Sequence, residues 1–280
     1  MNGLRTISGL VFAAAVAVGA SAASAQQTFN QQFFAHNSEM AKLQPAWITP
    51  LVECDPRLIQ FARASFSNEY TAARTETVNY GNARGMGLIG GDRFEFDYVQ
   101  PPFIQHNLAT SADGFGDTSV LVKYRIASGD AKHGNYDVAA LLNHSFATGS
   151  AKNGATTDTW GPTLAGGFVV RRFDVQSSLG GTMPTGKIAT QGRSIAWNAL
   201  TQTHVGHLWF EVENNATFYN RGAHNGLMQN FVTPAVFYVF RSKQWESTHP
   251  FFILDGGMQV ATSAFHTYNH NLISEARILF

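Results

Sequence analysis

The stretch YNHNLISEARILF, residues 268–280, indicates the fold of the chain. Its side chains alternate with a period of two, which is the pleat of a β-strand. One face carries Leu272, Ser274, Ala276, Ile278 and Phe280, and the other carries Ile273, Glu275, Arg277 and Leu279. The first face suits contact with lipid, whereas the acid and the base on the second require water or a partner. A strand of a soluble sandwich would alternate in the same way, so this pattern needs support from elsewhere in the chain.

This stretch resembles the carboxy-terminal signal strand of bacterial outer-membrane β-barrels, which commonly ends in Phe. The resemblance implies that Phe280 serves as an assembly signal read by the barrel assembly machinery. A protein of the outer membrane must also be exported, and residues 1–25 have the pattern of an export signal. They combine Arg5, an apolar run over residues 10–20 and Ala23-Ser24-Ala25 before Gln26, which is typical of a signal peptide cleaved after Ala25. We therefore expect the outer membrane of a Gram-negative bacterium.

Composition favours one large all-β domain and narrows the range of partners. Only 14% of the residues are charged, Phe occurs 22 times, and the net charge is zero, which argues against nucleic acid as a partner. No run of 18 apolar residues follows the amino-terminal segment, so spanning helices are not expected. Cys54 is the single cysteine, which excludes an internal disulfide. No cofactor is predicted.

Alternating segments recur along the chain between clusters of Gly, Asn, Asp and Pro. Ten are clear, at 92–100, 117–128, 135–147, 160–172, 174–184, 195–205, 208–219, 229–241, 250–262 and 269–280. The number of strands in such a barrel is even if both termini are periplasmic, so we expect residues 57–80 to form a hairpin that turns near 67–72. The prediction is an antiparallel transmembrane barrel of about twelve strands over residues 57–280, with ten strands as the alternative. Pro234 lies inside a strand and predicts a bulge.

The remaining segments are assigned around this barrel. Residues 26–56 are expected to be an irregular periplasmic lead-in or plug, with a short helix over residues 30–43. Short turns at 172–174 and 205–207 are assigned to the periplasmic side. Longer loops at 148–159, 184–195, 219–228 and 262–268 are assigned to the outside. Seven aromatic residues are expected in interface girdles, namely Trp160, Trp197, Trp209, Tyr124, Tyr219, Tyr238 and Tyr268.

Five strings in order carry a second resemblance: GFGDTSVLVKYRI (114–126), PTGK (184–187), AWNALTQTHVG (196–206), LWFEVENNATF (208–218) and GMQVATSAFHTYNHNLI (257–273). Together they resemble uncharacterised bacterial outer-membrane proteins akin to the family named after the meta-pathway of phenol degradation, which are barrel transporters. The resemblance covers residues 45–280. It implies a barrel that transports small molecules, and it carries over no catalytic residues.

Polar side chains on one face of the strands are expected to line the lumen. They are Arg93, Glu95, Asp97, Lys123, Arg125, Gln202, His204, Glu211, Glu213, Asp255, Gln259, Glu275 and Arg277. Their mixed charges leave two interpretations open: pairs that fill a narrow barrel, or a polar constriction that passes a small solute.

The function predicted from the sequence is a channel or facilitated transporter for small molecules, including apolar or aromatic ones, with membrane lipid as its surroundings. A sealed structural or surface-interaction barrel is the alternative. A barrel enzyme is the third option, but His144 and Ser145 are adjacent and point to opposite faces, and G-x-S-x-G and His-Glu-x-x-His motifs are missing. His266 and His270 are interpreted as loop polarity and not as a metal site. No catalytic or metal-binding residue is predicted.

Overall fold

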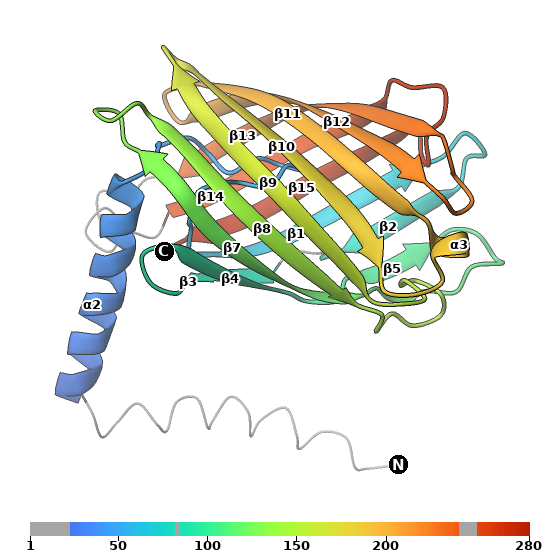
Figure 1. Ribbon diagram of the computed structural model, residues 1–280, viewed down its shortest axis with the longest axis horizontal. Coiled ribbons are helices and arrows are strands. Elements are labelled where there is room, and N and C mark those ends of the chain that lie inside the picture. The colour runs from blue at the N-terminus through green and yellow to red at the C-terminus, as the bar shows by residue number, and fades with distance from the viewer. Residues whose placement is uncertain (1–22, 82–84, 241–250) are drawn as a thin grey trace.

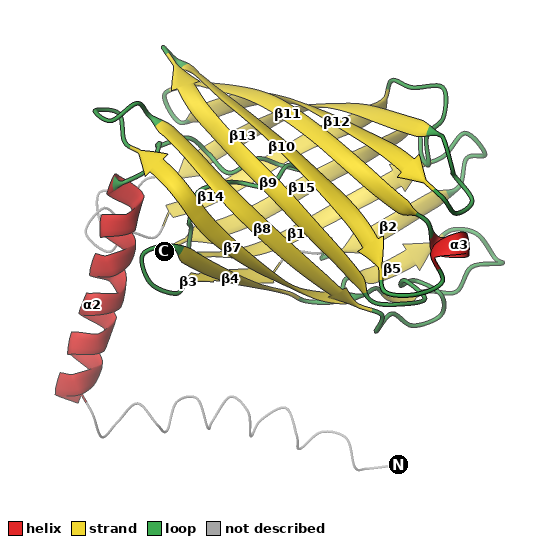
Figure 2. Cartoon of the chain, viewed as in Figure 1, coloured by secondary structure: helices red, strands yellow, loops and turns green. Residues whose placement is uncertain are grey.

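The computed structural model describes residues 23–81, 85–240 and 251–280 and forms a β-barrel (Figures 1 and 2). The helices are α2 (Ala23–Lys42) and α3 (Ile188–Gln191). The first strands are β1 (Phe61–Tyr70), β2 (Glu76–Tyr80), β3 (Gly85–Ile89), β4 (Phe94–Val99), β5 (Phe103–His106), β6 (Gly114–Phe115), β7 (Thr118–Gly129) and β8 (Tyr136–Phe146). They are followed by β9 (Thr159–Val170), β10 (Phe173–Pro184), β11 (Arg193–Val205), β12 (Leu208–Asn220), β13 (Met228–Phe240), β14 (Phe251–Ala261) and β15 (His270–Leu279). Among the described residues, no helix has the length and apolar character needed to cross a membrane.

The wall of the barrel has twelve strand positions, as the sequence predicted. β1 and β7 to β15 give ten of them, and two more are each shared by two short strands, β2 with β3 and β4 with β5. All pairings are antiparallel, and β1 closes the barrel against β15 from Phe61↔Leu279 to Tyr70↔His270. The first hairpin turns at residues 71–75, a few residues later than predicted, and residues 57–60 precede the first strand.

The two ends of the barrel differ. We call the end that carries α2 and the carboxy terminus the helix end, and the opposite end the loop end (Figure 1). Two-residue turns at 171–172 and 206–207 lie at the helix end, where Arg171 and Gly206 adopt left-handed φ values of 58° and 61°. Residues 147–158, 185–192, 221–227 and 262–269 connect strands at the loop end. The predicted division between short turns and long loops is confirmed.

Apolar side chains point outwards and polar ones inwards along the strands. Phe96, Leu164 and Leu179 are 52%, 55% and 56% exposed on the outside. Glu95 and Glu213 are completely buried inside, and Lys123 is 3% exposed. A soluble sandwich has the opposite arrangement, so this is the surface of a barrel that contacts lipid.

Several details differ from the expectations. The predicted bulge at Pro234 is wrong, because the register between β13 and β14 is the same on both sides of it. Pro234 has no N–H group to donate, and the β13–β14 ladder accordingly has no pair at Thr233 and Pro234. The bulge that is present lies in β7 between Arg125 and Ala127. The amino-terminal helix is longer than expected, and most of the predicted signal peptide, residues 1–22, lies outside the described residues.

Candidate functional site

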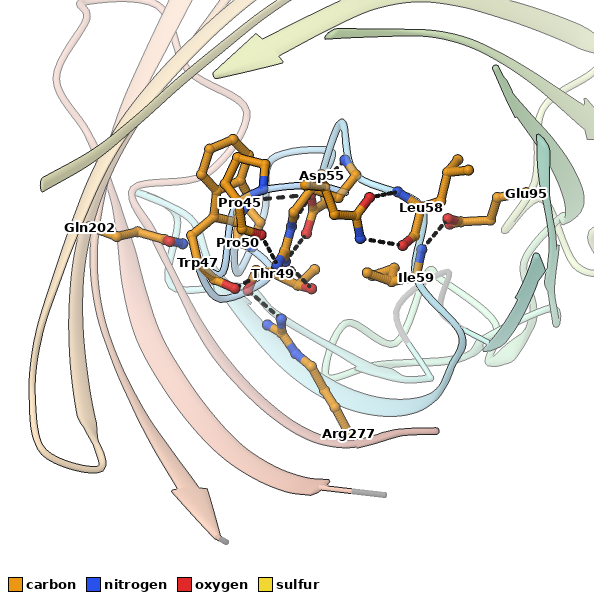
Figure 3. A network of polar contacts seen from close by, with 12 residues as sticks. Pro45, Trp47, Thr49, Pro50, Asp55, Leu58, Ile59, Glu95, Gln202 and Arg277 are labelled. Carbon is orange, nitrogen blue, oxygen red and sulfur yellow. Dashed lines mark hydrogen bonds and ion pairs between the residues drawn. The ribbon is translucent and has the colours of Figure 1, made fainter. Parts of the chain in front are cut away.

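The interior of the barrel contains the segment that links α2 to β1. We call residues 43–60 the inner segment. It has no regular secondary structure, and Pro45, Pro50 and Pro56 account for this because each removes a backbone donor. Its remaining backbone groups therefore need partners other than a helix or a sheet. The inward-facing side chains of the strands supply many of them, as Figure 3 shows for Glu95 and Arg277.

Two carboxylates of β12 hold the middle of the inner segment. Glu211 Oε1 accepts a hydrogen bond from the backbone N–H of Leu51 at 3.1 Å. Glu213 accepts one from Val52 at 2.8 Å through Oε1 and one from Glu53 at 2.9 Å through Oε2. Because Glu211 and Glu213 are two residues apart on a strand, both point inwards. They bind three consecutive N–H groups in a bend of the inner segment, and such charge-assisted bonds are stronger than neutral ones.

Cationic side chains bind the carbonyl groups. Arg277 Nη1 donates to the carbonyl of Thr49, and Arg63 Nη2 donates to that of Leu51 at 2.8 Å. Lys123 Nζ donates to the carbonyl of Arg57 at 2.7 Å. These cations also pair with carboxylates across the wall, for instance Lys123 with Glu95 at 2.8 Å. The buried charges thus satisfy one another and the inner segment together.

The inner segment is also closed on itself. Gln44 makes two hydrogen bonds with the backbone of Leu58, 2.8 Å from Nε2 to the carbonyl and 3.1 Å from the N–H to Oε1. Arg57 pairs with Asp55 at 2.6 Å and lies over the ring of Trp47, 5.4 Å from its centroid. These contacts join the two ends of the segment, as in a compact Ω-loop.

Apolar contacts fix the inner segment against the helix-end half of the wall. Trp47, Ile48 and Leu51 pack against a cluster on β12 to β15 that comprises Trp209, Ala235, Phe237, Val239, Ile253 and Ile273. Phe237 is completely buried and Ile253 is 1% exposed. Since fully burying a large apolar side chain stabilises by about 1.5–3 kcal/mol, this cluster stabilises the docked segment in addition to the polar contacts.

The inner segment separates two cavities. At the loop end, Val52, Glu53 and Cys54 form part of the wall of a cavity of about 430 Å³, which we call the loop-end cavity. At the helix end, Trp47 and Ile48 line a second cavity of about 200 Å³. The segment therefore lies across the path that a solute would take through the barrel.

The structure brings most of the thirteen predicted lumen residues into this interior. Glu95, Lys123, Arg125, Gln202, Glu211, Glu213, Asp255, Gln259, Glu275 and Arg277 are buried, and Asp97 is half-buried. Arg93 and His204 are exposed at the helix end. Arg93 donates to the outward-facing Tyr124 hydroxyl at 3.4 Å, and His204 stacks on Trp209 at 4.5 Å.

Sequence reasoning assigned residues 26–56 to a lead-in or plug, but it missed the contacts that hold the inner segment and the apolar surface to which the segment binds. One signal was available: residues 235–240, AVFYVF, are apolar on both faces of β13. A strand with two apolar faces is covered on both sides, so material inside the barrel was indicated. Trp209 was assigned to an interface girdle, but it points inwards because it shares the parity of Glu211, and it is 7% exposed. Trp160, Trp197, Tyr124 and Tyr238 are exposed, and Tyr219 is half-buried. The girdle assignment of Tyr268 is wrong, because its ring stacks on Phe231 and lines the loop-end cavity.

The remaining candidate groups form local contacts. His266 is hydrogen-bonded within its loop, through Nδ1 to the Ser263 carbonyl oxygen at 2.9 Å and through Nε2 to the side-chain amide of Asn269 at 3.0 Å, and His270 stacks on Tyr70. Three or more His, Cys, Asp or Glu side chains in a metal-binding arrangement are not found among the described residues. The Phe280 carbonyl accepts a hydrogen bond from Gln60 at 3.3 Å, next to the start of β1. Its role as an assembly signal stays a prediction.

Comparison with solved structures identifies the class of barrel. An outer-membrane channel from Pseudomonas putida F1 matches with a TM-score of 0.57 and 10% identity, covering 84% of this chain and all of that one. The NanC porin matches with a TM-score of 0.50 and 8% identity, covering 79% of this chain and 98% of that one. The chain shares the β-barrel fold of these outer-membrane proteins.

The sequence comparisons add no family, since no family model and no curated protein matches the chain. The two structural neighbours are named a porin and a channel, and neither is named an enzyme. The fold shared with these two structures and the apolar outer surface together indicate an outer-membrane β-barrel in contact with lipid. At 8–10% identity the likeness concerns the fold alone.

Proposed function

We propose that the protein is a gated outer-membrane channel or facilitated transporter for small molecules, without catalytic activity, and that the inner segment is its gate. The observation that carries this is the position of the segment between two cavities, held there by reversible contacts. Glu211 and Glu213 bind its N–H groups, and Arg63 and Arg277 bind its carbonyls. Water can take over such hydrogen bonds when the segment leaves. Apolar or aromatic solutes remain the prediction made from the sequence.

A sealed structural barrel is the second candidate. The ion pairs of Arg277 favour this candidate. The guanidinium of Arg277 lies 2.9 Å from the Asp255 carboxylate and 3.0 Å from the Glu275 carboxylate, and the Arg277 side chain is 1% exposed. Breaking a buried pair costs about 3–5 kcal/mol, so a barrel stabilised mainly by such pairs would resist opening. The two candidates differ in whether the inner segment ever leaves its site.

A disulfide between the inner segment and the wall separates these candidates. Cys54 is the single cysteine of the chain, and its thiol interacts with the side chain of Ser178 on β10. We expect Ser178→Cys to form a disulfide with Cys54 on oxidation, since both side chains line the loop-end cavity and interact with each other. The matched control is Ser177→Cys, because Ser177 is the preceding residue of the same strand and is exposed.

Conductance of the refolded full-length protein is then recorded in planar bilayers. We expect openings in the reduced Ser178→Cys variant, their loss on oxidation and their return with a reductant. The Ser177→Cys control should not respond. Equal conductance in the oxidised and reduced forms would exclude the inner segment as the gate. A correctly folded barrel that is silent in both forms would favour the sealed structural barrel.

A further inference from the structure

The loop-end cavity differs in chemistry from the rest of the interior. The paired charges Arg63, Arg277, Asp255 and Glu275 are bound to one another or to the inner segment. Among the described residues that line the loop-end cavity, by contrast, Glu53 is the only charged one, and the others are mostly amides, hydroxyls and glycines. An anion that entered would find no cationic side chain in this lining.

A row of hydrogen-bonded side chains crosses the wall of this cavity. We call Ser178, Asn198, Asn215, Gln259 and Tyr268 the amide row. Asn198 donates to Ser178 Oγ at 3.1 Å, Asn215 donates to Asn198 Oδ1 at 3.3 Å, and Gln259 donates to Asn215 Oδ1 at 3.3 Å. Tyr268 donates to Gln259 Oε1. Each amide keeps donors or acceptors in reserve, and the mutual contacts hold them in fixed orientations before a ligand arrives.

The cavity also presents an acceptor without a partner. Glu53 is 3% exposed, and its Oε1 accepts from the Cys54 thiol at 3.3 Å. Its Oε2 is buried and has no hydrogen-bond partner among the described residues, while the Ser178 side chain interacts with the same carboxyl group. A buried acceptor left unpaired is unfavourable, so a ligand donor at this position would be favoured.

Two further features give the cavity an apolar side and free space. Phe231 and Tyr268 stack with ring centroids 4.5 Å apart. Gly161 leaves room in the lining, because a Cβ added there would meet no atom nearer than 3.5 Å. A volume of about 430 Å³ falls within the range of small-molecule sites.

We propose that the loop-end cavity is a binding site for small neutral polyhydroxylated molecules of the size of a monosaccharide. Such a molecule exchanges its hydrogen bonds with water for bonds to the amide row and donates one hydroxyl to Glu53 Oε2. A purely apolar solute would leave the amides unsatisfied. As a binding site this proposal stands alone; as the substrate class of the channel it rests on the proposed function.

Binding is measured by equilibrium dialysis on refolded full-length protein in detergent, which does not require transport. The probes are glucose, glucuronate as its anionic analogue, protonated glucosamine as its cationic analogue, and phenol. We expect saturable binding of glucose that is at least about tenfold tighter than that of the other three, a difference of about 1.4 kcal/mol. Tighter binding of glucosamine would indicate a cation site at Glu53 and overturn the proposal, as would tighter binding of phenol.

Matched variants locate the site. Asn215→Ala removes the centre of the amide row and should weaken glucose binding about tenfold, the effect of one or two hydrogen bonds. Asn214→Ala changes the same residue type one position away, on the outward face of β12, and should leave binding unchanged. Equal effects of the two variants, or no glucose binding at all, would overturn the proposal. Glucose binding without conductance in the disulfide experiment would retain the site and remove the channel.

Discussion

Glu213→Ala tests the gate most directly, because this one side chain holds two N–H groups of the inner segment. The carboxylate accepts from Val52 at 2.8 Å and from Glu53 at 2.9 Å. In the alanine variant the N–H groups of Val52 and Glu53 lose their acceptor, and each unsatisfied buried group costs about 1–3 kcal/mol. Relief of repulsion between Glu213 and its neighbours Glu53 and Glu211 acts in the other direction. We take a net loss of about 2 kcal/mol, the low end for two donors.

A loss of about 2 kcal/mol raises the undocked fraction of the inner segment roughly 25-fold while the docked state still predominates. In planar bilayers the open probability of the Glu213→Ala channel should rise by this factor at unchanged unit conductance. Glu213→Gln keeps one acceptor oxygen, so its open probability should lie between those of the wild type and Glu213→Ala.

Asp158→Ala is the matched control for this experiment. Asp158 also accepts a backbone N–H, that of Ala147 at 2.9 Å, but it does so at the loop end and away from the inner segment. Its removal should leave the open probability as in the wild type. A folded Glu213→Ala barrel with wild-type open probability would refute the argument that these hydrogen bonds hold the gate.

Three further outcomes follow from the same structure. Arg277→Met leaves the carboxylates of Asp255 and Glu275 buried without their partner and should lower the free energy of unfolding by about 3–5 kcal/mol, measured by urea titration in lipid vesicles. Val212→Arg places a charge on the lipid-facing side of β12 and should cost about 2–4 kcal/mol in the same titration, whereas Val212→Leu should cost little. Burial, with a smaller contribution from Glu213, raises the pKa of Glu53 from 4.5 to about 7, so the docked segment binds a proton more tightly than the free one. Docking should therefore be strongest below pH 4.5 and weaken as the pH rises towards 7, which predicts an open probability that increases over this range and a smaller slope in Glu53→Gln.

The barrel could be predicted from the sequence because its signal is local and repeated. In β12 the order FEVENNATF alternates residue by residue, and the structure places Glu211 and Glu213 inwards and Val212 outwards. Twelve positions followed from the segment count and the rule that the number is even. The division of two positions into short strands, β2 with β3 and β4 with β5, leaves no comparable pattern in the sequence.

The docking of the inner segment could not be predicted, because its contacts join residues far apart in the chain. Leu51 and Glu211 are separated by 160 positions, and Thr49 and Arg277 by 228. The segment has no period of its own, so periodicity gives no register against the wall. Ile253 shares the face of Asp255 in β14, and an apolar residue in that polar row indicates that the lumen is partly filled.

If the inner segment is the gate, as proposed, the distribution of charge allows one barrel to be both closed and able to open. Charged side chains in the helix-end half face the backbone of the inner segment, and each such contact can be replaced by water if the segment leaves. A wholly apolar interface would lose all of its stabilisation when wetted, and the open state would be correspondingly rare. The polar contacts thus lower the free-energy difference between the two states, while the cluster around Phe237 and Leu51 keeps the closed state favoured. The same division leaves Glu53 as the one charged side chain among the described residues that line the loop-end cavity, because most of the charges lie where the inner segment is bound.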